Sequence, residues 1–356
     1  MLHIINSLYC IIIALIGVNF LIAFHEFGHF IFAKIFGIST PSFSIGFGPK
    51  LISKKIGDTT FSLSAIPFGG YVEIAGHEEV GQGEQKLAKS QDSNSFNVKP
   101  YWQKLLFMFG GIMFNLLFAY IAIIGLFAIG MPETPFLYPE KVKLIIQTVS
   151  PGSLAEKNKL KTDDAIIAIN NQPVDTFKEY IEAIQKSNNK PIEFKIKSAN
   201  GNIIEFKGEA PLGITGFKIK NLPAQGLISS IKNGITATNL MIFNLSQVFT
   251  NIFTKRQVSG LGGPIAIFSQ TFKTAQQGFK PFLIFLVIFS IQLSLLNLIP
   301  VPILDGGQIL FVTIEAIIGR ELPNKIRMSI FYACWAAMLL LMLFLSFHDI
   351  KRIFFN

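Results

Sequence analysis

A His-Glu-Phe-Gly-His sequence at residues 25–29 lies inside an apolar stretch that otherwise has the character of a membrane span. Residues 4–24 carry no charged side chain, and the apolar run resumes directly after the motif. Histidines four positions apart project from one face of a helix. In this pattern two imidazoles bind zinc and the intervening carboxylate activates water. Because ionisable groups at membrane depth are costly, the motif predicts a zinc hydrolase site within a membrane.

Composition supports an integral membrane protein. The 356-residue chain is 50% hydrophobic and only 15% charged, and this charged share is well below the ~25% that soluble domains carry. The net charge is +9, but no arginine-rich stripe interleaves with aromatic residues. Nucleic-acid binding is therefore not expected, and proximity to an anionic lipid bilayer accounts for the basic surface.

Four segments are apolar and long enough to cross a bilayer, which takes roughly 20 residues each. By the positive-inside rule, the lysine-rich loop after the first segment and the short basic connection before the fourth are cytoplasmic, which places both termini outside. A basic pair at residues 351–352 argues weakly against this orientation. The four predicted spans cover residues 4–36, 105–129, 282–301 and 330–347.

Two regions outside the spans have strand-like patterns. Residues 42–74 alternate apolar and polar side chains between glycine and proline punctuation, and they predict a small antiparallel sheet beside the first span. Residues 141–212 have the pattern of a separate soluble domain, since about 70 residues suffice for one core. Its predicted strands cover residues 142–149, 165–169, 192–197 and 202–207, and its predicted helices cover residues 154–158 and 176–186.

A third metal ligand is needed, because catalytic zinc takes three protein ligands and keeps one open position. Asp305 is the candidate, since it follows an apolar span that Pro300 and Pro302 interrupt. Broken helices occur in membranes where the freed backbone lines a cavity. Asp305 and His25 lie at similar distances from the starts of their spans, and these two spans run in the same direction. The motifs are therefore expected at similar depth, toward the cytoplasmic face.

Together these motifs resemble the site-2 protease family of intramembrane zinc metalloproteases, in particular the bacterial type that regulates sigma factors. The resemblance covers nearly the whole chain, and residues 151–155 and 164–170 resemble one bacterial PDZ domain. Many relatives carry histidine where this chain has Gln308. The residues that carry the family likeness are His25-Glu26-Phe27-Gly28-His29, Gly46-Phe47-Gly48-Pro49, Pro67-Phe68-Gly69-Gly70-Tyr71-Val72, Phe96-Asn97 through Trp102, Asn115, and Asn297 to Gly307.

The resemblance implies a set of roles and a domain plan. His25, His29 and Asp305 are expected to bind Zn²⁺, and Glu26 is expected to be the general base. The sheet within residues 42–74 is expected to pair with an unwound substrate strand. The domain plan has a first membrane part at residues 1–140, a PDZ-like domain at 141–222, and a second membrane part at 223–356.

Three further residues are candidates for the substrate-binding site. The resemblance implies that Asn297 and Asn115 shape that site or hold it together, and Pro302 is added as a candidate contact. Asn297 and Asn115 also have purely structural interpretations, as a partner of the backbone around the prolines and as a helix–helix contact. Residues 258–265 form either a flexible joint or an amphipathic segment that gates substrate entry.

The fold class expected is a polytopic α-helical membrane protein with about four transmembrane helices, a small membrane-associated β-sheet and an inserted PDZ-like α+β domain. The function expected is zinc-dependent intramembrane endopeptidase activity on single-span membrane proteins, such as anti-sigma factors or remnant signal peptides. The expected location is a bacterial inner membrane, with the site near the cytoplasmic side and the PDZ-like domain on the periplasmic side. The alternatives are an inactive scaffold that binds partner tails and a metal transporter or metalloenzyme of other chemistry.

Overall fold

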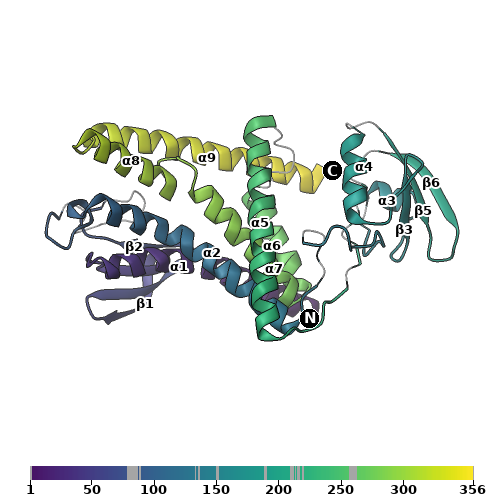
Figure 1. The fold of residues 1–356 in the computed structure, drawn as a ribbon, viewed down its shortest axis with the longest axis horizontal. Helices are drawn as coiled ribbons and strands as arrows, with labels where there is room; N and C mark the ends of the chain where they lie inside the picture. Colours follow the sequence, from purple (N-terminus) through teal and green to yellow (C-terminus); the bar gives the residue numbers. More distant parts are fainter. Residues whose placement is uncertain are drawn as a thin grey trace. The chain divides into compact units, whose positions relative to one another are not determined.

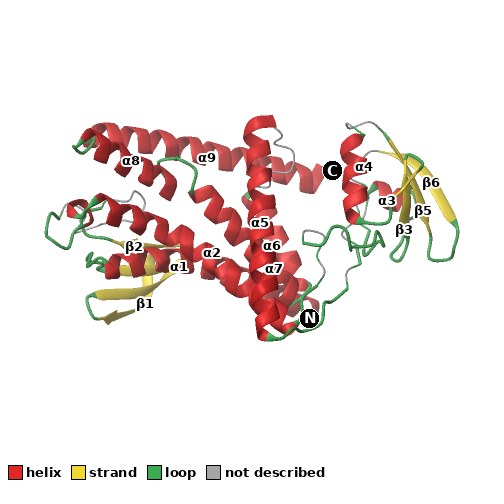
Figure 2. Ribbon diagram, in the orientation of Figure 1, coloured by secondary structure: helices red, strands yellow, loops and turns green. Residues whose placement is uncertain are grey.

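A computed structural model gives the fold, in which four of the described helices are long and apolar enough to cross a membrane (Figures 1 and 2). They are α1 (Leu2–Ile35), α2 (Tyr101–Ile129), α7 (Phe279–Asn297) and α9 (Asn324–Phe355). The polytopic helical fold class is thereby confirmed. The structure describes residues 2–77, 87, 90–132, 134, 137–149, 152–187, 191–208, 212, 214, 217–218, 220–255 and 263–355.

The other described elements are short helices, strands and three longer helices outside the candidate spans. Residues 256–262 lie outside the described residues, and they include residues 258–262 of the predicted joint or gating segment. The remaining elements are β1 (Ser42–Ile56), β2 (Thr59–Glu73), the 3-10 turn η1 (Phe96–Val98), α3 (Leu154–Lys157), β3 (Ala165–Ile169), β4 (Gln172–Pro173), α4 (Phe177–Lys186), β5 (Ile192–Lys197), β6 (Ile203–Gly208), α5 (Leu227–Lys255), α6 (Pro264–Gln276) and α8 (Asp305–Ile318).

The third span is shorter than its apolar run predicts. The prediction extended it through residue 301, but α7 ends at Asn297. Pro300 and Pro302 follow directly and lack the backbone N–H that continues a helix. The intervening chain closes in tight turns instead, in which the Leu304 N–H donates to the Val301 carbonyl at 2.8 Å. The break leaves Asp305 free to begin a new helix, α8.

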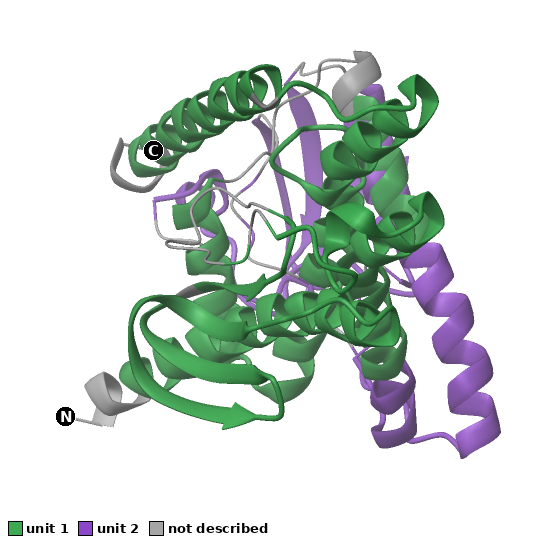
Figure 3. Ribbon diagram, turned by 90° about the vertical axis from the view of Figure 1, so that its left-hand side faces the viewer, with its two compact units in different colours: residues 1–123, 242–356 green, residues 124–241 purple. Residues whose placement is uncertain are grey.

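The chain forms two compact units, coloured separately in Figure 3. Unit 1 comprises Met1–Ile123 and Ile242–Asn356, and unit 2 comprises Ile124–Met241. In unit 1, α1, α2, α8 and the β1–β2 sheet share one apolar core, which contains Ala33, Phe107 and Val312. This core holds the three helices that carry the candidate site.

The strands of the unit 1 sheet are more continuous than the positions of glycine and proline predict. Residues 42–45 of β1 lie in register opposite both residues 60–63 and residues 70–73 of β2. Gly57 and Asp58 form the turn between the strands, whereas residues 48–49 and 67–70 lie within strands. The glycines and prolines there therefore bend a long hairpin rather than end separate strands.

Unit 2 contains a four-stranded antiparallel sheet in the order β4-β3-β5-β6. The predicted strands at 165–169 and 192–197 are confirmed as β3 and β5. The predicted strand at 142–149 is wrong, because none of these residues lies in a strand and their pairings with other described residues are isolated bridges. Those bridges join Lys143 to Thr176, Ile145 to Ala165, Ile146 to Phe217, and Val149 to Ile214.

The helices α1 and α2 touch through their backbones at one point. A Cβ atom added to Gly110 would lie 2.8 Å from the Gly28 carbonyl oxygen, and one added to Gly28 would collide with the Gly110 carbonyl. Neither obstacle is a flexible side chain, so a larger residue must push the helices apart. Gly28 lies within the His-Glu-x-x-His motif, so this contact also fixes how closely α2 approaches the motif.

We therefore predict that Gly110→Ala destabilises the protein by about 1–3 kcal/mol, the usual cost of overpacking a core. Gly125→Ala in the same helix is the matched control, because an added Cβ there meets nothing within 4 Å. Thermal unfolding of both variants in detergent measures the difference. Equal melting temperatures for the two variants would show that a larger residue at this backbone contact does not destabilise the protein.

Candidate metal centre

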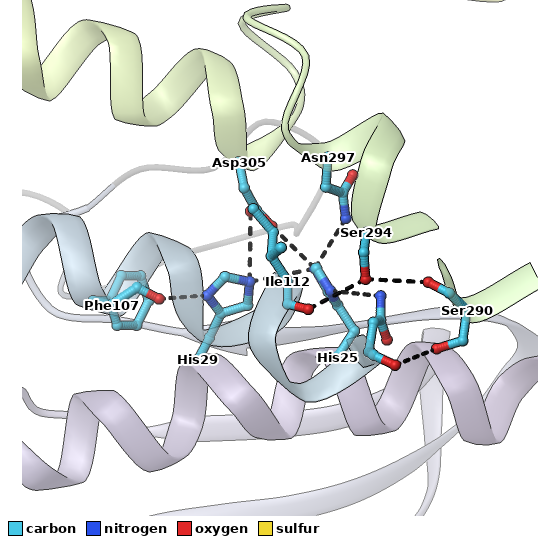
Figure 4. Close-up of polar contacts among 9 residues, drawn as sticks. His25, His29, Phe107, Ile112, Ser290, Ser294, Asn297 and Asp305 are labelled. Carbon is cyan, nitrogen blue, oxygen red and sulfur yellow. Dashed lines mark hydrogen bonds and ion pairs between the residues drawn. The ribbon is translucent and has the colours of Figure 1, made fainter. Parts of the chain in front are cut away.

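Helix α1 presents His25, Glu26 and His29 to one cavity of about 180 Å³. The two histidines are one helical turn apart, so both rings point from the same face toward α8 (Figure 4). The cavity lies wholly within unit 1. It is lined by His25, Glu26, His29, Phe107, Met108, Asn297, Ile303, Leu304, Asp305, Gln308 and Phe331.

Asp305, the first residue of α8, completes the group. Its Oδ2 lies 3.4 Å from His25 Nε2, and its Oδ1 lies 3.5 Å from His29 Nε2. The two Nε2 atoms are 3.3 Å apart. The three side chains are only 9–16% exposed. Residues far apart in the sequence thus bring three donor groups together, as Figure 4 shows.

These separations fit a tetrahedral zinc ion. Zinc binds imidazole nitrogen at about 2.0–2.1 Å, which sets neighbouring donor atoms of a tetrahedron about 3.3–3.4 Å apart. His25, His29 and Asp305 each offer one ligand atom within 4.8 Å of the others. Asp305 Oδ2 is also buried without a hydrogen bond from the described residues, as expected of an atom reserved for a cation. Two imidazoles and one carboxylate leave a fourth position for water or substrate.

The backbone of α2 fixes the tautomer of His29. Its Nδ1 lies 3.0 Å from the Phe107 carbonyl oxygen. A carbonyl can only accept a hydrogen bond, so Nδ1 of the neutral ring carries the proton and Nε2 keeps its lone pair. That lone pair faces Asp305 and His25. Such a second contact is typical of metal-binding histidines, where it orients the ring.

Asn115 on α2 makes a comparable contact with the ring of His25. Its Nδ2 lies 3.2 Å from His25 Nδ1, while its Oδ1 is buried with no hydrogen bond from the described residues. Rotating the amide by 180° exchanges the positions of its nitrogen and its oxygen. With the oxygen toward Nδ1, Oδ1 accepts from the Nδ1–H of the neutral ring, and His25 Nε2 keeps a lone pair for a metal.

Helix α7 supports this arrangement. The Ser290 hydroxyl donates to the Asn115 carbonyl at 2.8 Å, and the Ser294 hydroxyl donates to the Ile112 carbonyl at 3.2 Å (Figure 4). Asn297, at the end of α7, places Nδ2 3.5 Å from His25 Nε2. These contacts join α7 to α2 directly behind the candidate ligands.

The structure places the three tentative substrate residues differently. Asn297 lines the cavity, and Asn115 lies behind His25. The Pro302 carbonyl accepts a hydrogen bond from Gln308 at 2.7 Å. Sequence reasoning missed the Phe107 carbonyl, because any residue type supplies a carbonyl, and it missed the role of Gln308, for which the departure from the relatives' histidine was the one signal.

His77 is a buried histidine whose ring contacts Phe96 at a tilt of 58°, with ring centroids 4.9 Å apart. Burial lowers its pKa to about 3, and the positive charge of Arg327 acts in the same direction. The ring is therefore neutral at physiological pH. It lies outside the cavity that holds the three donor groups.

The family model of Peptidase family M50 matches residues 13–342 of this chain. A Helicobacter pylori protein named "Putative zinc metalloprotease" is 32% identical over 96% of this chain and 99% of its own. A Campylobacter jejuni protein named "Putative zinc metalloprotease Cj1068" is 30% identical over 94% of this chain and 92% of its own. The chain belongs to Peptidase family M50. The regulator of sigma-W protease RasP of Bacillus subtilis is also similar, at 26% identity over 94% of this chain and 96% of its own.

Membership of Peptidase family M50 confirms the resemblance to site-2 proteases. The protein is a multi-pass membrane metalloprotease. The family match runs from within α1 to within α9, so it spans both membrane parts that contribute to the cavity.

The geometry predicts that Asp305→Ala strongly weakens metal binding. Loss of one of three donor groups should cost more than the ~10–100-fold that loss of an outer-shell partner costs. Zinc per chain, measured by elemental analysis after dialysis, is the readout. Asp58→Ala, in the exposed turn between β1 and β2, should retain the wild-type content. Unchanged zinc in Asp305→Ala would exclude Asp305 as a ligand.

Proposed function

We propose that this membrane metalloprotease hydrolyses peptide bonds within the transmembrane segment of single-span membrane proteins, with zinc as its cofactor. One observation carries the proposal: the donor atoms of His25, His29 and Asp305 converge in a cavity that is lined by residues of all four candidate membrane spans. The relatives named zinc metalloproteases support the choice of zinc.

His25, His29 and Asp305 would hold the ion. When bound, zinc supplies Lewis-acid activation of water and of the scissile carbonyl. The protein supplies the fixed ring orientations and a partly enclosed cavity. The contacts of His29 with Phe107 and of His25 with Asn115 would orient both rings so that their Nε2 lone pairs face the ion.

Glu26 would act as the general base. It neighbours His25 on α1 and lines the same cavity. Its carboxylate takes a proton from water as the water oxygen bonds to the peptide carbonyl carbon. When the C–N bond breaks, the carboxylate returns that proton to the leaving amine. One group therefore handles the proton in both steps.

The β1–β2 sheet would hold the substrate in extended form. A Cβ atom added to Gly70 would lie 3.6 Å from Glu26 Cγ, so this part of β2 runs beside the proposed base. The Asn19 side chain of α1 donates to the Pro67 carbonyl at 2.5 Å and holds the strand there. A substrate helix must unwind to expose its carbonyl, and pairing with a strand would stabilise the unwound form.

Residues 141–222 would form a PDZ-like domain on the periplasmic side that limits which substrates approach. The active site would lie toward the cytoplasmic side of a bacterial inner membrane. Anti-sigma-factor-like proteins and remnant signal peptides are the proposed substrates. The name of RasP, a regulator of sigma-W, supports the first class.

Glu26→Gln should lower the rate of cleavage of a single-span reporter by about 10²–10⁴-fold, the usual contribution of a general base. Bound zinc should be unchanged, because Glu26 is not among the donor groups. Reporter cleavage in proteoliposomes and zinc content are measured on the same preparation. Glu182→Gln, on the exposed face of α4, is the control. Normal cleavage by Glu26→Gln would refute the assignment of the base.

A further inference from the structure

Gln308 joins two segments that flank its own helix in the chain. It lies in the first turn of α8 and lines the metal cavity. Its Nε2 donates to the Pro302 carbonyl at 2.7 Å, and its Oε1 accepts from Arg327 Nη2 at 3.1 Å. Arg327 belongs to the first part of α9, which follows α8 in the chain (Figure 1). One amide therefore links α9 to the broken segment before Asp305.

The segment that Gln308 holds determines where Asp305 lies. It runs from Asn297, at the end of α7, to Asp305, and it packs its backbone directly on the start of α8. A Cβ atom added to Gly306 would lie 2.5 Å from the Leu298 carbonyl oxygen, and one added to Gly307 would collide with the Val301 carbonyl. Because the segment is not helical, its carbonyls need partners from elsewhere. Gln308 supplies the partner for Pro302.

Arg327 and the Pro302 carbonyl select the same orientation of the Gln308 amide. A guanidinium group has five N–H donors and no acceptor, so it can face only the amide oxygen. The NH₂ group is then directed at Pro302. Without Arg327, the amide loses one of the two contacts that hold it against the Pro302 carbonyl.

The Arg327 side chain is itself held in place. Its Cζ lies 5.7 Å from the centroid of the Phe311 ring, which is 5% exposed. Stacking on an aromatic face suits the planar guanidinium better than a lysine ammonium. Lys325, two positions earlier, is exposed. The two basic side chains thus differ. Lys325 is exposed, whereas Arg327 contacts Gln308, which lines the metal cavity.

We propose that Arg327 and Gln308 are positioning residues of the metal centre, acting in series through the Pro302 carbonyl to fix Asp305. The inference rests on the proposed ligand set of His25, His29 and Asp305. It assigns to α9 a part in metal retention, although α9 contributes no donor group to the cluster.

The test is the rate at which the purified full-length protein, loaded with zinc in detergent, releases the ion to a chromogenic chelator. Gln308→Met and Arg327→Met should each speed release by about 10–100-fold, as loss of an outer-shell partner does. Lys325→Met, the matched control, should release zinc at the wild-type rate. Because the two residues act in series, the double variant should release zinc no faster than the faster single variant.

Gln308→Glu separates the two halves of the link. The carboxylate still accepts from Arg327 but no longer donates to Pro302, so release should be as fast as in Gln308→Met. Thermal unfolding of the zinc-free proteins should match wild type, which distinguishes lost positioning from lost folding. The inference is overturned if Arg327→Met or Gln308→Glu releases zinc at the rate of wild type and Lys325→Met. It is also overturned if the effects of the two single variants multiply in the double variant. A clearly lower melting temperature of the zinc-free variants would overturn it as well, because the faster release would then reflect lost folding.

Asp305→Ala distinguishes this failure from failure of the proposed function. If Asp305→Ala keeps its zinc, the ligand set itself is wrong. If Asp305→Ala loses zinc while Arg327→Met and Gln308→Met do not, the ligand set stands and only the positioning link is refuted.

Discussion

Three electron-rich groups, the side chains of His25, His29 and Asp305, converge within 3.3–3.5 Å of one another in a poorly exposed cavity. Such a cluster is costly unless a cation neutralises it, because a buried charge without a partner is strongly disfavoured. The spacing matches a tetrahedral zinc ion. The rest of unit 1 is organised to bring these groups together and to orient them, so the metal requirement explains features that would otherwise weaken the fold.

Several of those features break ordinary rules of helix packing. The prolines that end α7 give up helical hydrogen bonds, but they allow Asp305 to begin α8 at the cavity. The glycine contact between α1 and α2 brings α2 close enough for the Phe107 carbonyl to reach His29. Gln308 then supplies the hydrogen bond that the broken segment lacks. Each of these departures from regular helix packing accompanies a contact that orients a candidate ligand or the segment that carries one.

Much of this was predictable from sequence, for identifiable physical reasons. The four spans follow from length and apolarity, and the strands β3 and β5 follow from β-formers bounded by turns. The grouping of His25 and His29 with Asp305 follows from helical spacing and matched depth. The irregular bridges of residues 142–149 were not predictable, because they depend on tertiary partners. The Arg327–Gln308 contact was missed for the same reason, since the basic connection before the fourth span indicated only which side of the membrane it faces.

The central claim is that the metal centre cleaves substrates inside the membrane rather than beside it. The most direct measurement is to incubate the wild-type protein in proteoliposomes with a single-span substrate, with and without a zinc chelator, and to map the new termini by mass spectrometry. We expect a cut within the apolar segment of the substrate that disappears with the chelator and returns when zinc is restored. Cleavage confined to residues outside that segment, or cleavage that the chelator does not affect, would contradict it.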